Sequence, residues 1–309
     1  MKTLRALIQR NIKLFFKDKG MVIPSLITPI ILLVLYATFL GNVYKDSFYM
    51  GLPEGVSVPK KLANGFVGGQ LFSSLLAVSC VTVSFGANLL MVQDKVTGAI
   101  KDFTVTPVKK STIALAYYIA SFFSSMLICL VAIVACCIYL AFTGWYLSFL
   151  DIVWILFDGV LLVGFGTALS SIIHHFLSTQ GQMSAVCTIL SAGYGFICGA
   201  YMPLSQFSTG LYNAVCFLPG TYATSLIRNH ALSGVLEEMT AIGVPPQAVE
   251  GLKDAVDCNL YFFGNTVPVW VSGLILVLSV LLLTGVYVAL HARKKKNNQK
   301  KFKNPIKNS

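Results

Sequence analysis

Long uncharged hydrophobic segments alternate with short polar ones along this chain. Six of these segments are long enough to cross the ~30 Å hydrocarbon core of a bilayer as helices. They cover residues 22–40, 65–92, 111–142, 151–173, 182–201 and 266–291. The pattern predicts an all-α integral membrane protein whose six transmembrane helices occupy residues 21–291.

The start of the chain predicts a separate helix. An amphipathic helix that is basic on one side lies along the membrane surface and is attracted to anionic lipids. We therefore expect residues 1–20 to form a cytoplasmic interfacial helix before the first span. Its apolar face would consist of Leu4, Leu7, Ile8, Ile12, Phe15 and Phe16, with the basic residues largely opposite.

The segment between the fifth and sixth spans, residues 203–265, predicts an external structure. Its apolar run at 211–227 is interrupted at Pro219 and is too short to cross a bilayer. We expect this run to form a re-entrant outer helical hairpin or one at the outer interface, with the Arg228 side chain snorkelling from its end.

Two other outer elements are predicted. Turn residues between 41 and 64 indicate a short outer loop after the first span. The charged residues of 233–257 are mainly acidic. This segment predicts a small external cap, to which the sequence assigns no role. A short helix in this cap would begin after Pro245 and have one apolar side, made of Ala248, Val249, Leu252 and Val256.

Composition and charge agree with a membrane protein. Of the 309 residues, 56% are hydrophobic and 11% are charged, which is too apolar for one soluble core. The net charge of +11 does not indicate nucleic-acid binding, because the cations gather in residues 1–20, 93–110 and 292–309. By the positive-inside rule these segments face the cytoplasm. We predict a multi-pass protein of the cell membrane with both termini cytoplasmic and a basic, disordered tail at 292–309.

Six of the eight cysteines lie inside predicted spans, where a thiol acts as a small hydrophobic group. Cys216 and Cys258 both fall in the outer segment. An oxidising exterior permits a disulfide there, but the two positions alone leave both a disulfide and separate thiols open.

Asp158 is the one carboxylate inside a predicted span and away from its ends. Acids inside a membrane are costly, so a contact to a cationic substrate or a proton site is one interpretation. The other, which we favour, is that outer water or a hydroxyl on a neighbouring span satisfies it. His174 is excluded as its partner within one straight helix, because 16 residues span about 24 Å.

The fifth span carries small residues at every fourth position, namely Ser191, Gly195 and Gly199. Such a row lets helix backbones approach closely. It predicts a packing face, used either within the chain or against a second copy.

Common catalytic and phosphate-binding motifs are absent from the chain, including the G-x-x-x-x-G-K-[ST] loop, H-E-x-x-H, C-x-x-C and G-x-S-x-G. We therefore expect no catalytic residues, no metal and no cofactor in this chain, and no ATP hydrolysis by it.

Residues 93–110, which read QDKVTGAIKDFTVTPVKK, form a polar interruption between the second and third spans. Gly98 permits a tight bend, and Pro107 disfavours helical geometry at Thr106. Lys109 and Lys110 are suited to anchor the next span at the headgroups. We expect a short cytosolic helix followed by a stop, and we call residues 93–110 the elbow.

The elbow resembles that of the type 2 permeases of ATP-binding cassette (ABC) exporters. In that family the elbow is a coupling helix that rests on a separate ATPase subunit, and the ATPase binds ATP and Mg. The matching positions are Asp94, Lys95, Gly98, Asp102, Phe103 and Pro107, with Asp94 where a glutamate is commoner. A second run, around the end of the fifth span, fits the family's order at Gly199, Met202, Pro203, Pro219, Tyr222 and Arg228.

The resemblance implies a permease subunit of an ATP-driven exporter that moves an amphipathic drug, peptide, lipid or glycan out of the cell by alternating access. Its partners would be a cytosolic ABC ATPase and a second permease, either a copy or a paralogue. A six-span secondary transporter or channel with no ATPase partner is the alternative. A membrane-embedded enzyme would need clustered catalytic groups, which the sequence does not offer. The sequence does not identify the substrate.

Overall fold

The computed structural model describes residues 2–53 and 56–303, which are almost entirely helical. Two short strands are the only β-structure in this part of the chain. The elements are α1 (Lys2–Lys17), α2 (Lys19–Leu35), the π-helical turn η1 (Tyr36–Leu40), α3 (Gly41–Met50), α4 (Lys60–Val96), α5 (Ala99–Thr104), α6 (Lys110–Thr143), α7 (Phe149–Phe176), α8 (Gln180–Ile197), the 3-10 turn η2 (Leu204–Gln206), α9 (Thr209–Val215), α10 (Pro219–Ala241), α11 (Pro246–Ala255), β1 (Leu260–Phe262), β2 (Asn265–Val267) and α12 (Val269–Lys303).

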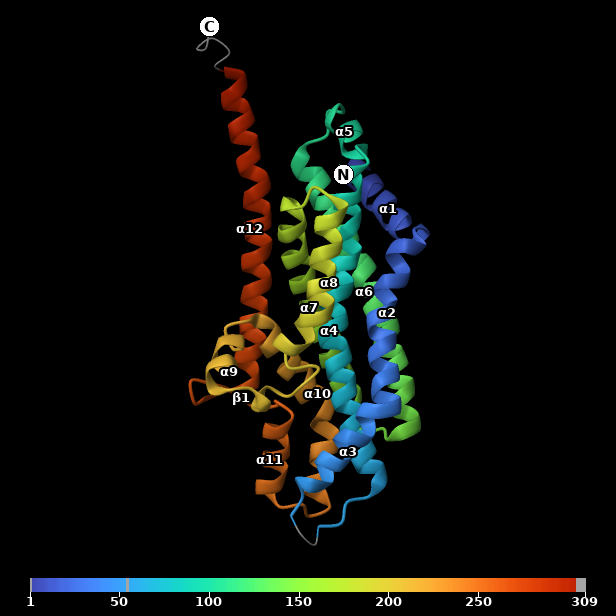
Figure 1. Ribbon diagram of the computed structural model, residues 1–309, viewed down its shortest axis with the longest axis vertical. Coiled ribbons are helices and arrows are strands. Elements are labelled where there is room, and N and C mark those ends of the chain that lie inside the picture. The colour runs from blue at the N-terminus through green and yellow to red at the C-terminus, as the bar shows by residue number, and fades with distance from the viewer. Residues whose placement is uncertain (1, 54–55, 304–309) are drawn as a thin grey trace.

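The long helices run side by side along the long axis of the molecule (Figure 1). One end holds α5, the start of α1 and the last turns of α12, and we call it the elbow end. The other end holds α3 and α11, and we call it the cap end. Because each helix satisfies its own backbone hydrogen bonds, such a bundle suits a bilayer.

Five helical stretches of the described chain are long and apolar enough to cross a membrane: Lys19–Met50, Lys60–Val96, Lys110–Thr143, Phe149–Phe176 and Val269–His291. The prediction of an all-α membrane protein is confirmed. The fifth of the six predicted spans corresponds to α8, an 18-residue helix outside that set of five. That α8 also crosses the bilayer stays a prediction.

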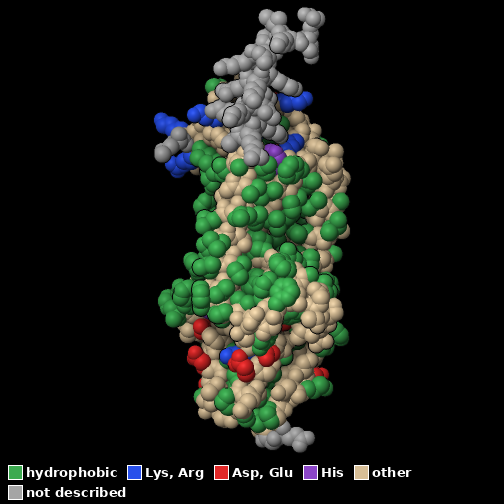
Figure 2. Space-filling model, turned by 90° about the vertical axis from the view of Figure 1, so that its left-hand side faces the viewer, with side chains coloured by type: hydrophobic (Ala, Val, Ile, Leu, Met, Phe, Trp, Pro, Cys, Tyr) green, Lys and Arg blue, Asp and Glu red, His purple; other side chains and the backbone are tan. Residues whose placement is uncertain are grey.

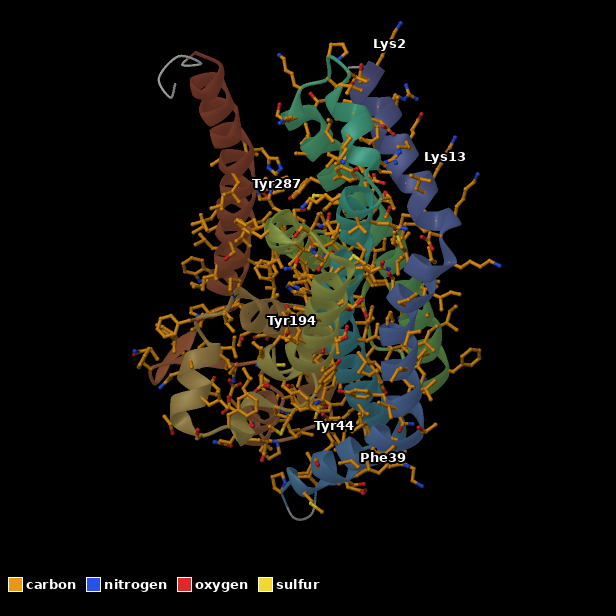
Figure 3. The ribbon with its side chains drawn as sticks, turned by 45° about the horizontal axis from the view of Figure 1, so that its top comes forward. Lys2, Lys13, Phe39, Tyr44, Tyr194 and Tyr287 are labelled. Carbon is orange, nitrogen blue, oxygen red and sulfur yellow. The ribbon has the colours of Figure 1, made fainter. Side chains whose placement is uncertain are left out.

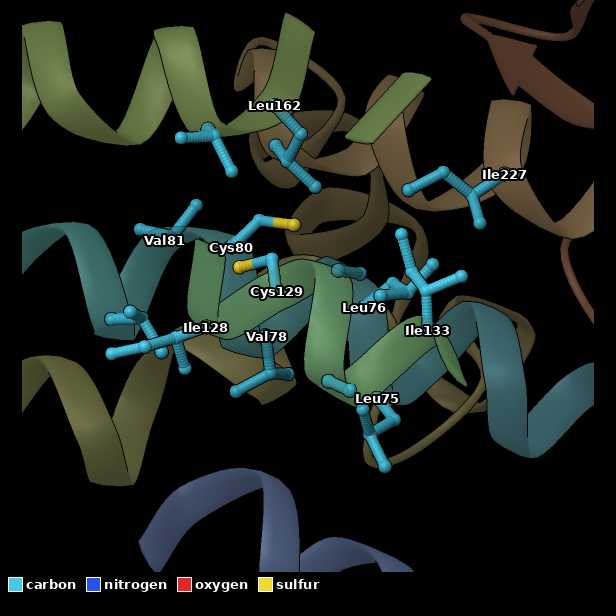
Figure 4. Close-up of a cluster of buried hydrophobic side chains, with 14 of the residues drawn as sticks. Leu75, Leu76, Val78, Cys80, Val81, Ile128, Cys129, Ile133, Leu162 and Ile227 are labelled. Carbon is cyan, nitrogen blue, oxygen red and sulfur yellow. The ribbon is translucent and has the colours of Figure 1, made fainter. Parts of the chain in front are cut away.

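Helix α4 is the centre of the bundle. It packs against α2, α6, α7, α8 and α10, and 89% of its most apolar window is buried. Close approach depends on small residues, since a Cβ on Gly69 would sit 2.7 Å from the carbonyl oxygen of Ala231 in α10. Figure 4 shows α4 and α6 side chains interlocking between Leu162 of α7 and Ile227 of α10. The second span is thus enclosed by protein rather than by lipid.

The outermost helices present an apolar surface. Only 11% of the most apolar window of α12 is buried within the chain, and 25% of that of the first span. Figure 2 shows the resulting hydrophobic band, with Lys and Arg at the elbow end and Asp and Glu toward the cap end. This arrangement fits a bilayer around the middle of the bundle.

The predicted outer loop at 41–64 is shorter than expected. Helix continues from α2 through η1 and α3 to Met50, so the loop begins at Gly51. The reason is packing: the Tyr36 and Tyr44 rings stack 5.4 Å apart, and Phe48 is buried against Phe66. These contacts stabilise another two to three turns of helix that the hydrophobicity pattern alone does not indicate.

The prediction of a disordered tail from residue 292 is wrong over most of its length. Helix α12 continues without a break to Lys303. This follows from helix-compatible Arg, Lys and Gln residues, with no Gly or Pro until Pro305. Residues 304–309 lie outside the described residues.

The predicted outer hairpin has one short and one long arm. Helix α9 and helix α10 meet near Pro219, which occupies the first turn of α10. The second arm does not end near residue 227 but continues to Ala241, packed against α4, α7 and α12. The Arg228 side chain therefore does not snorkel; it is 1% exposed in the middle of this helix. A re-entrant path into the bilayer stays a prediction.

The cap contains the predicted short helix, α11. All four residues expected on its apolar side are buried, in a cluster with the end of α10 and the start of α4. The antiparallel β1–β2 hairpin, by contrast, is not predicted by the sequence pattern. Its turn places Phe263 and Gly264 at positive φ values of 48° and 81°, as two-residue hairpin turns require.

Candidate functional site

The elbow is a turn and a short helix at the exposed end of the bundle. Gly98 has φ +82°, a left-handed conformation that lets the chain leave α4 and enter α5. Helix α5 ends at Thr104. Beyond it, Val105 is 85% exposed, and Asp102 and Pro107 are also exposed. The elbow therefore presents an acid and an apolar side chain to its surroundings.

An ion pair joins the base of the elbow to the N-terminal helix. Arg10 Nη1 of α1 lies 2.6 Å from Asp94 Oδ2 in the last turn of α4, and its Nη2 lies 3.2 Å from Oδ1. Tyr117 of α6 also donates a hydrogen bond to this carboxylate. The hydrogen bond to Asp94 raises the pKa of the Arg10 guanidinium despite partial burial. Three helices therefore meet at one buried carboxylate.

The same arginine reaches the short helix of the elbow. The Arg10 guanidinium carbon lies 4.9 Å from the centre of the Phe103 ring, within the range of a cation–π contact. Lys2 and Lys13 instead point away from the bundle in Figure 3. Helix α1 is thus a brace between α5, α4 and α6 rather than a helix that contacts lipid alone.

Lys95 joins the elbow to the far end of α7. Its ammonium donates to the carbonyl oxygens of His174, His175 and Leu177, at 2.8, 3.0 and 3.0 Å. These are carbonyls at a helix C-terminus, where the helix dipole favours a cation. A displacement of the elbow would therefore be passed to the turn between α7 and α8.

Four of the six residues matched to the coupling helix of the permeases fall into two groups. Asp94 and Lys95 face inward and hold the elbow to its neighbours. Asp102 and Pro107 face outward, while Phe103 is half-buried under Arg10 and Gly98 forms the turn. Contact of these residues with an ATPase stays a prediction. Of the two groups, the outward-facing Asp102 and Pro107 are the ones placed to make that contact.

A polar network that the sequence analysis missed lies between α4, α6 and α7. Asn88 donates to Ser171 Oγ at 3.0 Å and also contacts Ser170, and it accepts a hydrogen bond from Ser121 Oγ at 2.8 Å. All four side chains are buried. Isolated Asn and Ser residues in an apolar run give no signal of meeting, because their partners lie 33 to 83 positions away.

Asp158 has a partner that the sequence analysis did not name. His230 Nδ1 of α10 lies 2.6 Å from Asp158 Oδ2, and the Trp154 ring stacks on the His230 ring at 5.6 Å. We expected outer water or a hydroxyl on a neighbouring span to satisfy Asp158. It is instead 2% exposed and paired with this ring nitrogen. The pair supports the structural interpretation, with a ring nitrogen in place of the hydroxyl.

Arg228 is the most extensively bonded residue near the cap end. It donates to Ser73 and Ser74 of α4 at 3.3 and 3.1 Å, to Gly199 O at 3.1 Å and to Val256 O, and it pairs with Asp257 at 3.4 Å. Burial raises the pKa of Asp257 more than the Arg228 guanidinium lowers it. Because the guanidinium has five N–H donors, it can join α4, α10, the end of α8 and the cap at one point.

The small-residue row of the fifth span is not a continuous helix face. Helix α8 ends at Ile197, and Gly199 lies beyond it at φ +74°. Gly195 receives the ring of Tyr201 from the chain that folds back, and Ser191 is exposed. The prediction of one packing stripe is therefore wrong, because the row spans a helix end.

Cys216 and Cys258 are both buried thiols that are not bonded to each other. Burial raises the pKa of Cys258 to about 12. Among the described residues, no group of three or more His, Cys, Asp or Glu side chains is placed to hold a metal ion.

A groove of about 790 Å³ runs between α2 and α8. Its lining is mainly apolar, with hydroxyl groups on the α8 side. The residues are Pro24, Ile27, Ile31, Leu32, Leu35, Leu40, Cys187, Thr188, Ser191, Ala192, Phe196 and Tyr201. No charged side chain is among them, so the groove suits an apolar or amphipathic surface.

The fold and the elbow together define a multi-pass helical membrane protein in which a short exposed helix joins two of the longest spans. The family model for the ABC-2 type transporter matches residues 2–231, from α1 to the first half of α10. The chain belongs to this family, as its resemblance to the permeases implied. It is a transmembrane subunit of an ABC transporter. No curated protein matches the chain.

Proposed function

We propose that this chain is the permease subunit of an ATP-driven exporter. Two such chains, or this chain and a paralogue, would combine with two cytosolic ATPase subunits to move an amphipathic compound out of the cell. The observation that carries the proposal is the elbow: a short helix, exposed on its outer side, whose base is bonded to α1, α6 and α7. A loop that merely joined two spans would not need these connections.

The internal bonds of the elbow suggest how ATP-driven movement would reach the spans. Movement of α5 would be passed to α1 through Arg10 and Phe103, and to the α7–α8 turn through Lys95. The Asn88 network would then move α4, α6 and α7 as one block. A rigid-body rotation of this kind is a common route between two transporter states.

The groove between α2 and α8 is our candidate surface for the amphipathic cargo or for a second permease. It is uncharged, and exposed apolar side chains extend it along α2, such as Ile23, Ile30 and Val34. A contiguous apolar surface with polar groups at one side fits amphipathic molecules through shape rather than through ionic contacts.

Co-purification tests this proposal. A tagged chain, solubilised in mild detergent from its native membrane, should bring with it a soluble ATPase with a G-x-x-x-x-G-K-[ST] loop. Asp102→Lys, which reverses the exposed charge of α5, should weaken this association, whereas Glu250→Lys on α11 should not. A secondary transporter or channel would purify without an ATPase in all three cases, and that result would contradict the proposal.

A further inference from the structure

A pocket of about 380 Å³ lies at the elbow end, on the side of the bundle where α12 stands. The ends of α4, α6 and α7, together with α5 and α12, enclose it. Four of its lining residues are basic or can become so: Lys95, Lys110, His175 and His291. The described residues that line it include no Asp or Glu. The pocket therefore suits an anion.

An apolar slot of about 190 Å³ adjoins this pocket, and the two share Ala114 and His291. The slot runs between α6 and α12. Its inner wall is fixed, because Tyr287 donates to the Ala114 carbonyl oxygen at 3.0 Å and stacks on Tyr118. On its outer side, Leu115 and Val288 are 42% and 57% exposed. The slot thus opens toward the surroundings of the hydrophobic band.

We infer that the pocket and the slot together bind an anionic phospholipid from the leaflet at the elbow end, the inner leaflet in the proposed topology. The headgroup phosphate would lie in the basic pocket, and one acyl chain would follow the slot along α6 and α12. Basic pockets between transmembrane helices on the cytoplasmic side are suited to anionic headgroups. A lipid fits better than a soluble anion because the apolar slot continues directly from the pocket.

The level of the pocket in the molecule supports this occupant. In Figure 2 a histidine and several Lys and Arg side chains mark the edge of the hydrophobic band at the elbow end. The headgroups of a surrounding bilayer lie at that edge. Lys95 already donates to three carbonyl oxygens. Lys95 therefore adds positive charge to the pocket, while Lys110 is the exposed cation placed for direct contact with the headgroup.

A lipid bound here would touch both ends of the elbow. The lining includes Lys95 before α5, Ile100 within it and Lys110 after it. The headgroup would thus bridge the two chain segments that connect α5 to α4 and α6. Its site is separate from the α2–α8 groove, with which it shares no lining residue. The inference concerns a bound membrane component and does not depend on the identity of the cargo.

Native mass spectrometry of the purified full chain tests the inference, with dioleoyl phosphatidylglycerol and dioleoyl phosphatidylcholine as probes. We expect the wild-type chain to retain the anionic lipid preferentially. Lys110→Gln should weaken its binding about fivefold, the usual effect of one cation near a headgroup. Lys109→Gln is the matched control, since Lys109 is a neighbouring exposed lysine that does not line the pocket.

The slot needs its own variant. Val288→Trp should fill the slot from its exposed side and reduce retention of the anionic lipid. Leu281→Trp, on another exposed part of α12, should not. Both positions are exposed, so the fold should tolerate the change, and circular dichroism melting checks this.

Three results would overturn the inference. The first is equal retention of the two lipids by the wild type. The second is equal retention of the anionic lipid by each variant and its control. The third is displacement of the lipid by glycerol 3-phosphate at equal concentration, which would show that the pocket binds a soluble phosphate without need of the slot.

Discussion

Arg10 Nη1 lies 2.6 Å from Asp94 Oδ2, and this pair joins residues 84 positions apart in the chain. It makes the N-terminal helix part of the same unit as the elbow. A helix that only floated on the membrane surface would keep its arginine in water or at the headgroups. Here the guanidinium instead faces a carboxylate that is 7% exposed.

Arg10→Gln should lower the stability of the chain, because it leaves the Asp94 carboxylate buried with Tyr117 as its main donor. We expect a loss of about 1–3 kcal/mol, below the value for a fully buried pair, since Arg10 is partly exposed. Thermal unfolding in detergent measures this, with Arg5→Gln as the control from an exposed position of the same helix. Equal melting of the two variants would show that the pair is not stabilising.

Gly234 offers a test of the contact between α10 and the loop before α7. A Cβ at this position would overlap the backbone carbonyl of Tyr146, which no side-chain rotation can relieve. Gly234→Ala should therefore cost about 1–3 kcal/mol by overpacking. Gly251→Ala, with open space around its Cβ position in α11, should be neutral or slightly stabilising. The difference in melting temperature between the two alanine variants checks the prediction.

Asp158 and His230 allow the structural and functional interpretations to be separated. Asp158→Asn keeps an oxygen that can accept a hydrogen bond from His230, whereas Asp158→Leu removes it and leaves the ring nitrogen of the partly buried His230 without this partner. We expect Asp158→Leu to melt at a lower temperature than Asp158→Asn, and Asp158→Asn to support ATPase turnover like the wild type in the assembled complex. A normal melting temperature with lost turnover in Asp158→Asn would assign the carboxylate to transport.

The outer cysteines should be chemically inert in the folded protein. Burial raises the pKa of Cys258 to about 12 and also raises that of Cys216, so little reactive thiolate forms near neutral pH. N-ethylmaleimide should label Cys187, which is only partly buried where it lines the open groove, before either of these buried thiols. Peptide mass mapping before and after denaturation measures the order. A cross-linked peptide containing Cys216 and Cys258 would contradict the free thiols.

Local sequence signals predict the parts of this fold that depend on neighbours along the chain. The apolar side of α11, the amphipathic character of α1 and the turn at Gly98 follow from helical spacing or from the freedom of one glycine. Prediction from the sequence fails where a residue's role depends on a distant partner. Arg228 was expected at a surface, but Ser73, Ser74 and Asp257 surround it.

The elbow shows the same limit of prediction from sequence within one short stretch. Its existence follows from Gly98 and Pro107, but the sequence does not tell which of its charges face outward. Asp94 and Asp102 are both acids, and only the positions of Arg10 and Tyr117 make the first a buried bracing residue. Hydrophobic periodicity carries no information about such pairing, because ionic partners have no fixed sequence separation.

Photo-crosslinking from the elbow tests most directly whether this helix meets an ATPase. A benzoyl-phenylalanine at position 102, on the exposed side of α5, should form an adduct with the ATPase subunit in native membranes. The same group at position 250, in the cap, should form none. An adduct from position 250, or none from position 102 in a complex that still purifies with its ATPase, would show that the elbow is not the point of contact.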